Sequence, residues 1–346
     1  MSSRNKGLAC GGLFLLLTVA AFALLLRGQD PGQLWSALIQ ADPRWLAVGA
    51  GCMACYFCCE ARNIRTGLSL FGSSASYPAC LRYALTGFFF SSITPSASGG
   101  QPMQLLAMHQ DGHPAAPGVL ALLTEFFSFQ LAGAVLAVGG FLLCRQELLD
   151  LDKAVQLCFL VGAGLNLVVV LLLCTALLSP RLLPFLWGKL MIPAGKLFPR
   201  RAEGWAAWGR AQWADLRRCT HCYRTNKKKL AGMVAVSLLQ LAACHSIPYW
   251  VYLAFGLENA RLVGVIGMQA VLFLSVSSLP LPGAVGLSEG GFLLLYRSLF
   301  PPALISGAMI LSRVLSFYLC LAVSGAALCA SCLFRSSRKN APASCE

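Results

Sequence analysis

Six stretches of the chain are apolar for long enough to cross a lipid bilayer as helices. They cover about residues 8–26, 45–60, 117–143, 154–178, 230–255 and 303–333. A helix needs about 20 residues, at 1.5 Å per residue, to cross about 30 Å of hydrocarbon. Of the 346 residues, 57% are hydrophobic and 12% are charged, whereas about 25% are charged in a soluble globular protein. The sequence therefore predicts an all-α polytopic membrane bundle formed by residues 1–346 as a single domain, and it excludes a soluble enzyme, a disordered chain and a disulfide-framed secreted domain.

Two further apolar stretches, about residues 83–110 and 262–299, are interrupted by residues that disfavour a helix. The first contains ITPSASGGQP and the second contains SSLPLPGAVGLSEGG. Broken backbone at membrane depth is tolerated only where protein or a water-filled cavity covers it. A pair of interrupted segments in corresponding halves of a chain is typical of transporters. The alternative interpretation is that proline and glycine merely kink two ordinary membrane helices.

The distribution of positive charge favours segments that enter the membrane and return. The chain has 27 Lys and Arg against 13 Asp and Glu, and 12 of the 27 lie in residues 181–229. Only Glu203 and Asp215 oppose them there, so this segment carries 12 − 2 = 10 of the net charge of +14. Cytoplasmic loops of membrane proteins are enriched in Lys and Arg. If both interrupted segments return to the side they entered from, residues 181–229 and both termini lie in the cytoplasm.

We therefore expect six full spans and two re-entrant hairpins of opposite orientation, arranged as an inverted repeat in the membrane. The basic segment also contains an amphipathic stretch, residues 202–218, with Trp205, Trp208 and Trp213 on one face. This pattern is typical of a helix lying in the membrane interface and contacting anionic lipid. We interpret the positive charge as membrane orientation and lipid contact, with no nucleic acid as a direct partner.

The 16 cysteines do not predict a disulfide framework or a metal site. Most of them lie inside apolar runs, where a free cysteine behaves as a small hydrophobic residue. Cys219 and Cys222 form one CxxC around His221, but a structural zinc ion needs four ligands and no second pair is near in the sequence. We expect no metal and no cofactor.

Three of the charged residues within the predicted membrane segments are candidates for a binding site. They are Glu125, Glu289, which follows the second interrupted segment, and Arg313 in the last span. A charge at the centre of a membrane helix costs about 2.5–3.5 kcal/mol on insertion scales, so such residues are usually paired or functional. Two interpretations stand. Either they neutralise one another structurally, or Arg313 attracts a lipid phosphate while Glu125 or Glu289 attracts a cationic headgroup or orients the arginine.

The interrupted segments predict a second kind of anion site. Helices that restart near Gly99-Gly100 and Gly286-Leu287 would present free backbone N–H groups and the positive end of the helix dipole, which bind phosphate. Neighbouring hydroxyl and amide side chains would add contacts. The candidate lipid-binding residues are Arg313, Glu289, Glu125, Pro95, Ser98, Gly99, Gly100, Gln101, Pro282, Gly283, Gly286 and Ser288.

The two interrupted segments also carry a family resemblance. ITPSASGGQPMQ (93–104), followed by His109-Gln110-Asp111-Gly112, together with LPLPGAVGLSEGG (279–291), resembles the lysylphosphatidylglycerol synthase transmembrane family. This family is the flippase-like membrane part of the multiple peptide resistance factor, a phosphatidylglycerol lysyltransferase. Glu289 and Arg313 match a glutamate and an arginine of the family. Glu125 matches a glutamate that the family usually follows with arginine, whereas Phe126 follows it here.

The resemblance implies a protein that binds and translocates a phospholipid headgroup, such as lysylphosphatidylglycerol, and thereby contributes to resistance against cationic peptides. The implied partners are an anionic or aminoacylated phospholipid, the membrane, a separate synthase or envelope enzyme, and a second copy of the chain. Full-length family members add a cytoplasmic acyltransferase-like domain, whereas this chain ends about a dozen residues after its last predicted span. The alternative is therefore the membrane subunit of a lysyltransferase whose catalytic domain is on another chain, and whether the chain takes part in enzyme chemistry stays open.

Overall fold

The computed structural model describes residues 31–94, 97–149, 153–178, 222, 225–277 and 287–339. Within these ranges the protein is built from helices and contains no strand, which confirms the predicted all-α bundle. Several expectations fall outside the described residues. These are the first predicted span (8–26), the amphipathic stretch (202–218), and the candidate site residues Pro95, Pro282, Gly283 and Gly286.

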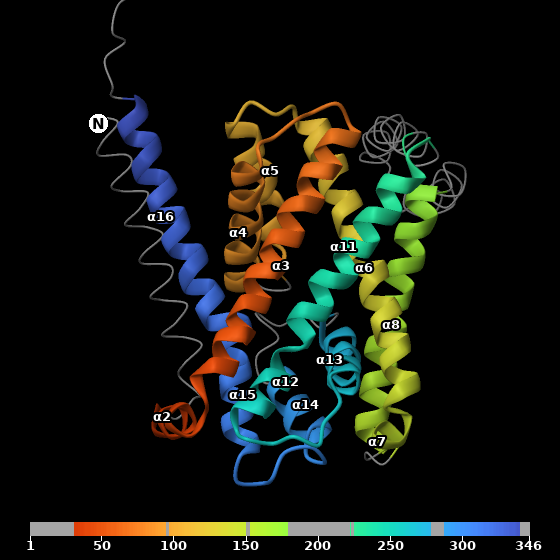
Figure 1. Cartoon of the computed structure of the whole chain (residues 1–346). Coiled ribbons are helices and arrows are strands. Elements are labelled where there is room, and N and C mark those ends of the chain that lie inside the picture. Colours follow the sequence, from red (N-terminus) through yellow and green to blue (C-terminus); the bar gives the residue numbers. More distant parts are fainter. Residues whose placement is uncertain are drawn as a thin grey trace, which may run out of the picture.

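The described chain begins with a short helix at the lower side of the bundle and then rises through a long one (Figure 1). Helix α2 spans Pro31–Gln40 and exposes Trp35 and Ile39, as expected for a helix at the membrane interface. Helix α3 spans Pro43–Leu70. Asp42 caps it by accepting a hydrogen bond of 2.9 Å from the Arg44 N–H, and the proline stands in the first turn, where its missing N–H costs nothing.

The predicted second span, residues 45–60, is shorter than the helix that contains it. Helix α3 continues for ten residues beyond Glu60, to Leu70. The charged residues Glu60, Arg62 and Arg65 interrupt the apolar run but not the helix. Asn63, Ile64, Gly67 and Leu68 continue the buried face beyond Glu60 at helical spacing.

The first interrupted segment forms a helical hairpin. Helices α4 (Tyr77–Ile93) and α5 (Gly100–Gln110) pack against each other, and Figure 1 shows both in the upper half of the bundle. At the tip, Thr94 Oγ1 donates to the Phe90 carbonyl at 2.6 Å and accepts from the Gly99 N–H at 2.9 Å. Gly100 allows the two helices to approach closely, because a Cβ there would lie 2.0 Å from Ser91 Oγ and 2.8 Å from the Gly87 carbonyl oxygen.

The next helices run the height of the bundle. Helix α6 descends, the short α7 lies at the lower side, α8 rises, and α11 descends into α12 after a break at Ser246 and Pro248 (Figure 1). Their bounds are Ala115–Leu143 for α6, Arg145–Leu149 for α7, Lys153–Leu178 for α8, Lys227–His245 for α11 and Ile247–Ala254 for α12.

The second interrupted segment lies on the opposite side. Helices α13 (Leu262–Ser277) and α14 (Leu287–Leu295) occupy the lower half of the bundle (Figure 1). The chain then rises through α15 (Ile305–Arg313), a π-helical turn η3 (Val314–Tyr318) and α16 (Leu319–Lys339). The order of long helix, hairpin and long helix thus occurs twice, in α3–α6 and in α11–α16, with opposite directions.

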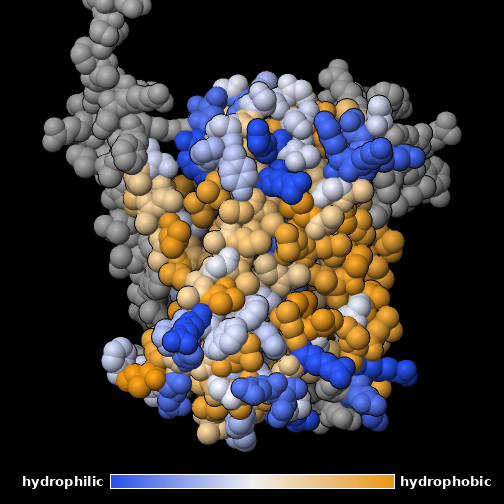
Figure 2. Space-filling model, viewed as in Figure 1, coloured by the Kyte–Doolittle hydropathy of each residue, from blue (hydrophilic) through white to orange (hydrophobic). Residues whose placement is uncertain are grey.

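The surface carries a hydrophobic band between two polar ends (Figure 2). On α6 and α8 this band includes Val138, Leu142, Leu160 and Leu171, each at least half exposed. In the described part, three helical segments are long and apolar enough to cross a membrane: Ala115–Leu143, Lys227–Ala254 and Ile305–Ser331. Helix α3, with 28 residues, spans about 42 Å, but the charges near its upper end lower its hydropathy.

Small residues let the second hairpin pack directly on the long helices. A Cβ on Gly140 of α6 would lie 2.3 Å from the carbonyl oxygen of Gly267 on α13, and a Cβ on Gly162 of α8 would lie 2.1 Å from that of Ser275. Since a backbone carbonyl cannot move aside, both glycines are required at these contacts. Close approach through small residues is the usual basis of helix association in membranes, where apolar surface gains little by leaving lipid.

Candidate lipid-binding site

Arg313 lies beside two residues from the start of α14. Its Nε atom is 3.7 Å from Glu289 Oε1, and its guanidinium donates a hydrogen bond to Ser288 Oγ. The Arg313 and Glu289 side chains are only 17% and 14% exposed. The structure thus brings together the three predicted site residues on this side of the bundle, and Glu289, not Glu125, is the partner of Arg313.

The position of Arg313 depends on two features of local backbone structure. Glu289 stands in the first turn of α14, where a negative charge is favoured by the helix dipole. Arg313 is the last residue before the π turn η3, and its guanidinium carbon lies 5.8 Å from the centre of the Phe317 ring in that turn. π turns frequently occur at functional sites. The arginine is therefore held by a carboxylate, a hydroxyl and an aromatic face.

The start of α5 matches the predicted restart at Gly99-Gly100. Helix α5 begins at Gly100, and Gly99 at its N-cap offers no side-chain acceptor to the first turn. Ser98 and Gln101 are exposed beside it, and Ala97 in the preceding turn has a positive φ of 53°. Likewise α14 begins at Leu287, one residue after Gly286. Helix α5 therefore starts where the sequence predicted, whereas the residues before Leu287 lie outside the described part of the chain.

Glu125 lies in a separate polar cluster with residues that the sequence analysis missed. It is 8% exposed and interacts electrostatically with Glu60 of α3, which is equally buried. Gln104 of α5 donates a hydrogen bond of 3.1 Å to Glu60 Oε1. Glu60 could have been found from its position on the buried face that α3 continues beyond it. Gln104 ends the motif ITPSASGGQPMQ, but the sequence suggested no role for it.

A row of aromatic rings lies between the two clusters. The Phe57 ring of α3 is 5.2 Å from that of Phe88 of α4, and the Phe88 ring is 6.3 Å from that of Phe317. Phe57 precedes Glu60 by one helical turn, and Phe317 lies under Arg313. Aromatic rings from α3, α4 and η3 thus lie between the Glu60–Glu125 cluster and the Arg313–Glu289 cluster.

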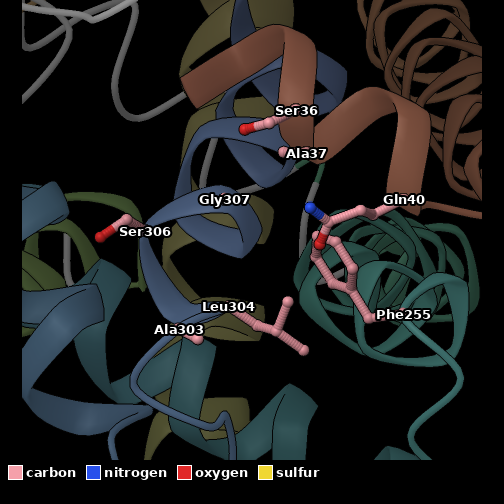
Figure 3. Close-up of a pocket in the computed structure, with 8 residues that line it drawn as sticks. All are labelled: Ser36, Ala37, Gln40, Phe255, Ala303, Leu304, Ser306 and Gly307. Atoms are coloured by element: carbon pink, nitrogen blue, oxygen red, sulfur yellow. The ribbon is translucent and has the colours of Figure 1, made fainter. Parts of the chain in front are cut away.

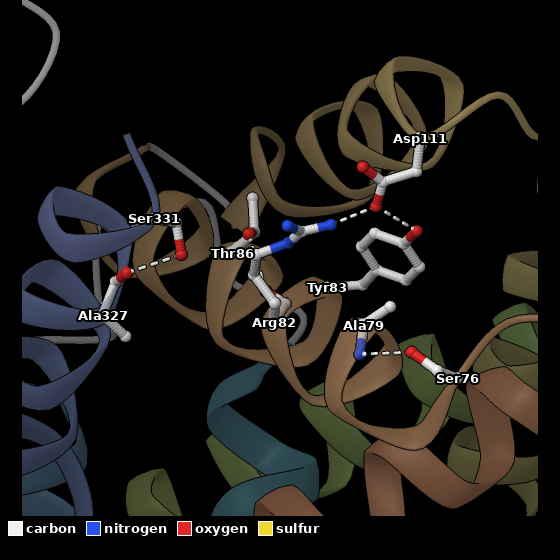
Figure 4. A network of polar contacts seen from close by, with 8 residues as sticks. All are labelled: Ser76, Ala79, Arg82, Tyr83, Thr86, Asp111, Ala327 and Ser331. Atoms are coloured by element: carbon white, nitrogen blue, oxygen red, sulfur yellow. Dashed lines mark hydrogen bonds and ion pairs between the residues drawn. The ribbon is translucent and has the colours of Figure 1, made fainter. Parts of the chain in front are cut away.

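A polar network closes the upper end of the first hairpin (Figure 4). Arg82 of α4 forms an ion pair with Asp111, and the Tyr83 hydroxyl donates to the same carboxylate oxygen at 2.5 Å. The neighbouring loops are joined by a 2.8 Å hydrogen bond between Ser73 Oγ and His113 Nδ1. These contacts fix the end of α5 that is opposite to its exposed first turn.

Two hollows lie at the lower side of the protein, away from the predicted site residues. One, of about 240 Å³, is lined by residues of α2, by residues within 303–307 at the start of α15, and by Phe255 (Figure 3). The other, of about 540 Å³, lies beside it and includes Asp42, Trp45 and Glu258. None of the predicted lipid-binding residues lines either hollow.

The described residues contain no group of three or more His, Cys, Asp or Glu side chains that could hold a metal ion. The polar side chains at depth are instead suited to charge pairing and hydrogen bonding. One cluster presents a guanidinium and the other presents two carboxylates. The two clusters therefore contain charged groups of opposite sign.

Comparison with known proteins places the chain in a family. No curated protein matches it. The family model described as "Lysylphosphatidylglycerol synthase TM region" matches residues 11–324, which is most of the chain. With the apolar helices of the bundle, this match makes the chain a multi-pass membrane protein. It belongs to the family of lysylphosphatidylglycerol synthase transmembrane regions.

Proposed function

We propose that this protein binds a phospholipid headgroup within the membrane and carries it from one leaflet to the other. The observation that carries the proposal is Arg313, held by Glu289 and Ser288 where the second hairpin meets the last long helix. Intramembrane arginines usually face a pathway or a partner rather than lipid tails. A guanidinium binds phosphate oxygens through two parallel hydrogen bonds, which suits a lipid phosphate.

The two hairpins support a path across the membrane. They lie on opposite halves of the bundle, and each contains a helix that starts within it, α5 and α14. Helix starts inside the protein present unpaired N–H groups to anions. The proposed lipid contacts are therefore Arg313, Ser288, Glu289 and the first turn of α5 with Ser98, Gly99, Gly100 and Gln101, with Glu125 facing the cationic part of the headgroup.

We place the upper side of Figure 1 in the cytoplasm of a bacterial cell. Helix α8 rises to that side and α11 starts there. Of the 12 Lys and Arg residues of segment 181–229, nine lie between these helices in the sequence, and the other three are the first residues of α11. The described C-terminal helix α16 also ends on that side. The positive-inside tendency then assigns it to the cytoplasm.

A lipid-exposure assay tests the proposal. Cells with the wild-type protein, Arg313→Ala or Glu289→Ala are treated with an amine reagent that does not cross membranes, and labelled and total aminoacylated phospholipid are compared. We expect the labelled fraction to fall about tenfold in either variant, which corresponds to about 1.4 kcal/mol, while total lipid is unchanged. Arg261→Ala, an exposed arginine at the lower side, is the control. A fall in total lipid with an unchanged labelled fraction would contradict transport.

A second candidate function is that of a membrane subunit for lysyl transfer to phosphatidylglycerol, and the family description, which names a synthase, favours it. Incorporation of labelled lysine into lipid, in a host with and without this gene and its neighbours, separates the two. Synthesis that requires this chain supports the subunit. Synthesis that is independent of the chain, with altered exposure, supports transport.

A further inference from the structure

Two buried glutamates from different helices, Glu60 of α3 and Glu125 of α6, are near enough to interact electrostatically, and neither is in an ion pair between described residues. Glu60 and Glu125 are each 8% exposed and interact electrostatically with each other. Among the described residues there are two ion pairs, Arg82–Asp111 and Arg313–Glu289, and neither includes these glutamates. Within the described part of the chain, Glu60 accepts a hydrogen bond from the uncharged amide of Gln104.

Two like charges in this position would be costly. Burial removes the water that stabilises each carboxylate, and the low dielectric strengthens their mutual repulsion. A single proton bound by the pair removes one charge and with it the repulsion. Pairs of this kind take up and release protons as a unit, and carboxylates of transporters and pumps use the same chemistry in proton relays.

A third side chain beside the pair has unused hydrogen-bonding capacity. Gln240 of α11 is fully buried, and within the described part of the chain neither its amide nitrogen nor its amide oxygen has a hydrogen-bond partner of normal geometry. It interacts with the Tyr56 hydroxyl, which in turn interacts electrostatically with both Glu60 and Glu125. The pair therefore belongs to a cluster of buried polar side chains from α3, α5, α6 and α11.

The other titratable groups on the surrounding helices do not supply a counter-charge. From α11, the Cys244 thiol faces Tyr56, whereas His245 packs on the Phe273 ring of α13 at 5.4 Å. From α4, which packs on both α3 and α5, Arg82 is engaged with Asp111 at the upper surface. The net charge of this polar cluster is thus determined by the two glutamates and by what they bind.

We propose that Glu60 and Glu125 form a proton-binding site that exchanges its proton for a cationic lipid headgroup. On exchange, a carboxyl group gives its proton to water, and the carboxylate left behind balances the ammonium group of the lipid. The reverse step restores the bound proton after the headgroup leaves. The exchange rests on the proposed lipid transport, whereas proton binding by the pair does not.

Infrared spectroscopy tests proton binding without any transported lipid. The full-length protein in phosphatidylcholine nanodiscs is titrated, and the C=O band of protonated carboxylic acid is followed. We expect the band at neutral pH in the wild-type protein and its loss in Glu60→Gln/Glu125→Gln. Each single variant, which keeps one carboxyl without its like-charged neighbour, should lose the band at a different pH from the wild type. Glu258→Gln, in an exposed loop, is the matched control.

Three results of that titration would overturn the proton site. They are a wild-type protein with no such band at neutral pH, a band that persists in the double variant, and a band displaced by sodium ions at constant pH, which would make the pair a metal-cation site. Circular dichroism and gel filtration establish that each variant is folded. If the double variant is unfolded, Glu125→Gln and Glu60→Gln provide the comparison.

Vesicles test the exchange. The protein is reconstituted into phosphatidylcholine vesicles containing aminoacylated phosphatidylglycerol, and the fraction reached by an impermeant amine reagent is followed with and without a pH gradient. We expect the gradient to change the rate for wild type and Glu258→Gln, and this response to be lost in the double variant. A rate that ignores the gradient in the wild type overturns the exchange alone. Absence of any protein-dependent lipid movement overturns the proposed function, and the infrared result still judges the proton site.

Discussion

The side chain of Gln104 occupies the space that a Cβ on Gly87 would fill. Such a Cβ would lie 2.1 Å from Gln104 Nε2, and this nitrogen donates to Glu60 at 3.1 Å. Gly87 of α4 therefore lets α5 pack closely enough for Gln104 to reach α3. The hydrogen bond from Gln104 to Glu60 thus depends on the packing of α3, α4 and α5 and on the absence of a side chain at Gly87.

We expect Gly87→Ala to displace Gln104 from Glu60 and to destabilise the protein by about 1–3 kcal/mol, the usual cost of overpacking. Thermal unfolding in detergent measures the loss. Gly51→Ala is the control, since a Cβ at Gly51 of α3 has no neighbour within 4 Å. Equal stability of the two variants would show that Gln104 moves aside at no cost.

The contact between α6 and α13 gives a second prediction. We expect Gly140→Ala to force the second hairpin away from α6, because its Cβ would lie 2.3 Å from the Gly267 carbonyl oxygen. Its unfolding temperature should fall well below that of Gly139→Ala, the adjacent position with no neighbour within 4 Å. An alanine at residue 139 that is as harmful as one at 140 would contradict this packing.

Arg313 and Glu289 allow structural and functional roles to be separated. Removing one partner of a buried pair leaves an uncompensated charge and costs about 3–5 kcal/mol. We expect Arg313→Met to lose stability on this scale and Arg313→Met/Glu289→Gln to recover much of it. Lipid exposure should stay low in both, because neither offers a guanidinium to phosphate. Recovery of lipid exposure in the double variant would mean that the pair is structural.

The assignment of the upper side to the cytoplasm is tested with a biotin-acceptor peptide. Inserted after Ser74, in the exposed loop between α3 and α4, it should be modified by the biotin ligase of the cytoplasm. Inserted after Glu258, in the loop between α12 and α13, it should not. Immunoblotting with streptavidin reads both. Modification after Glu258 alone would invert the bundle.

Local features of the fold were predictable from the sequence. Asp42-Pro43 is a typical helix start and stands at the start of α3, and the start of α5 followed from the glycines at the first interrupted segment. These features depend on residues within one turn of each other. The end of α3 was missed because Glu60 and two arginines resemble a loop when buried and exposed faces are not separated.

The site was predictable only in part. A charged pair at depth was anticipated for Arg313, but sequence spacing cannot decide between Glu125 and Glu289 as its partner. That choice depends on how α14 meets the last long helix. The neighbours of Glu125 come from α3 and α5, which requires the packing of three helices to be known. The π turn after Arg313 has no residue pattern that marks it.

That π turn links the arginine to the packing of the distant half of its helix. A π turn holds one residue more than an α turn, so every residue beyond Tyr318 is rotated by about 100° relative to an uninterrupted helix. Leu321 and Leu328 then meet Phe89 of α4 in a buried cluster. Deletion of one residue from the turn would swing these leucines toward lipid or swing the guanidinium away from Glu289. An uninterrupted α-helix could not keep both contacts. The extra residue therefore sets the rotation of the whole of α16 relative to Arg313.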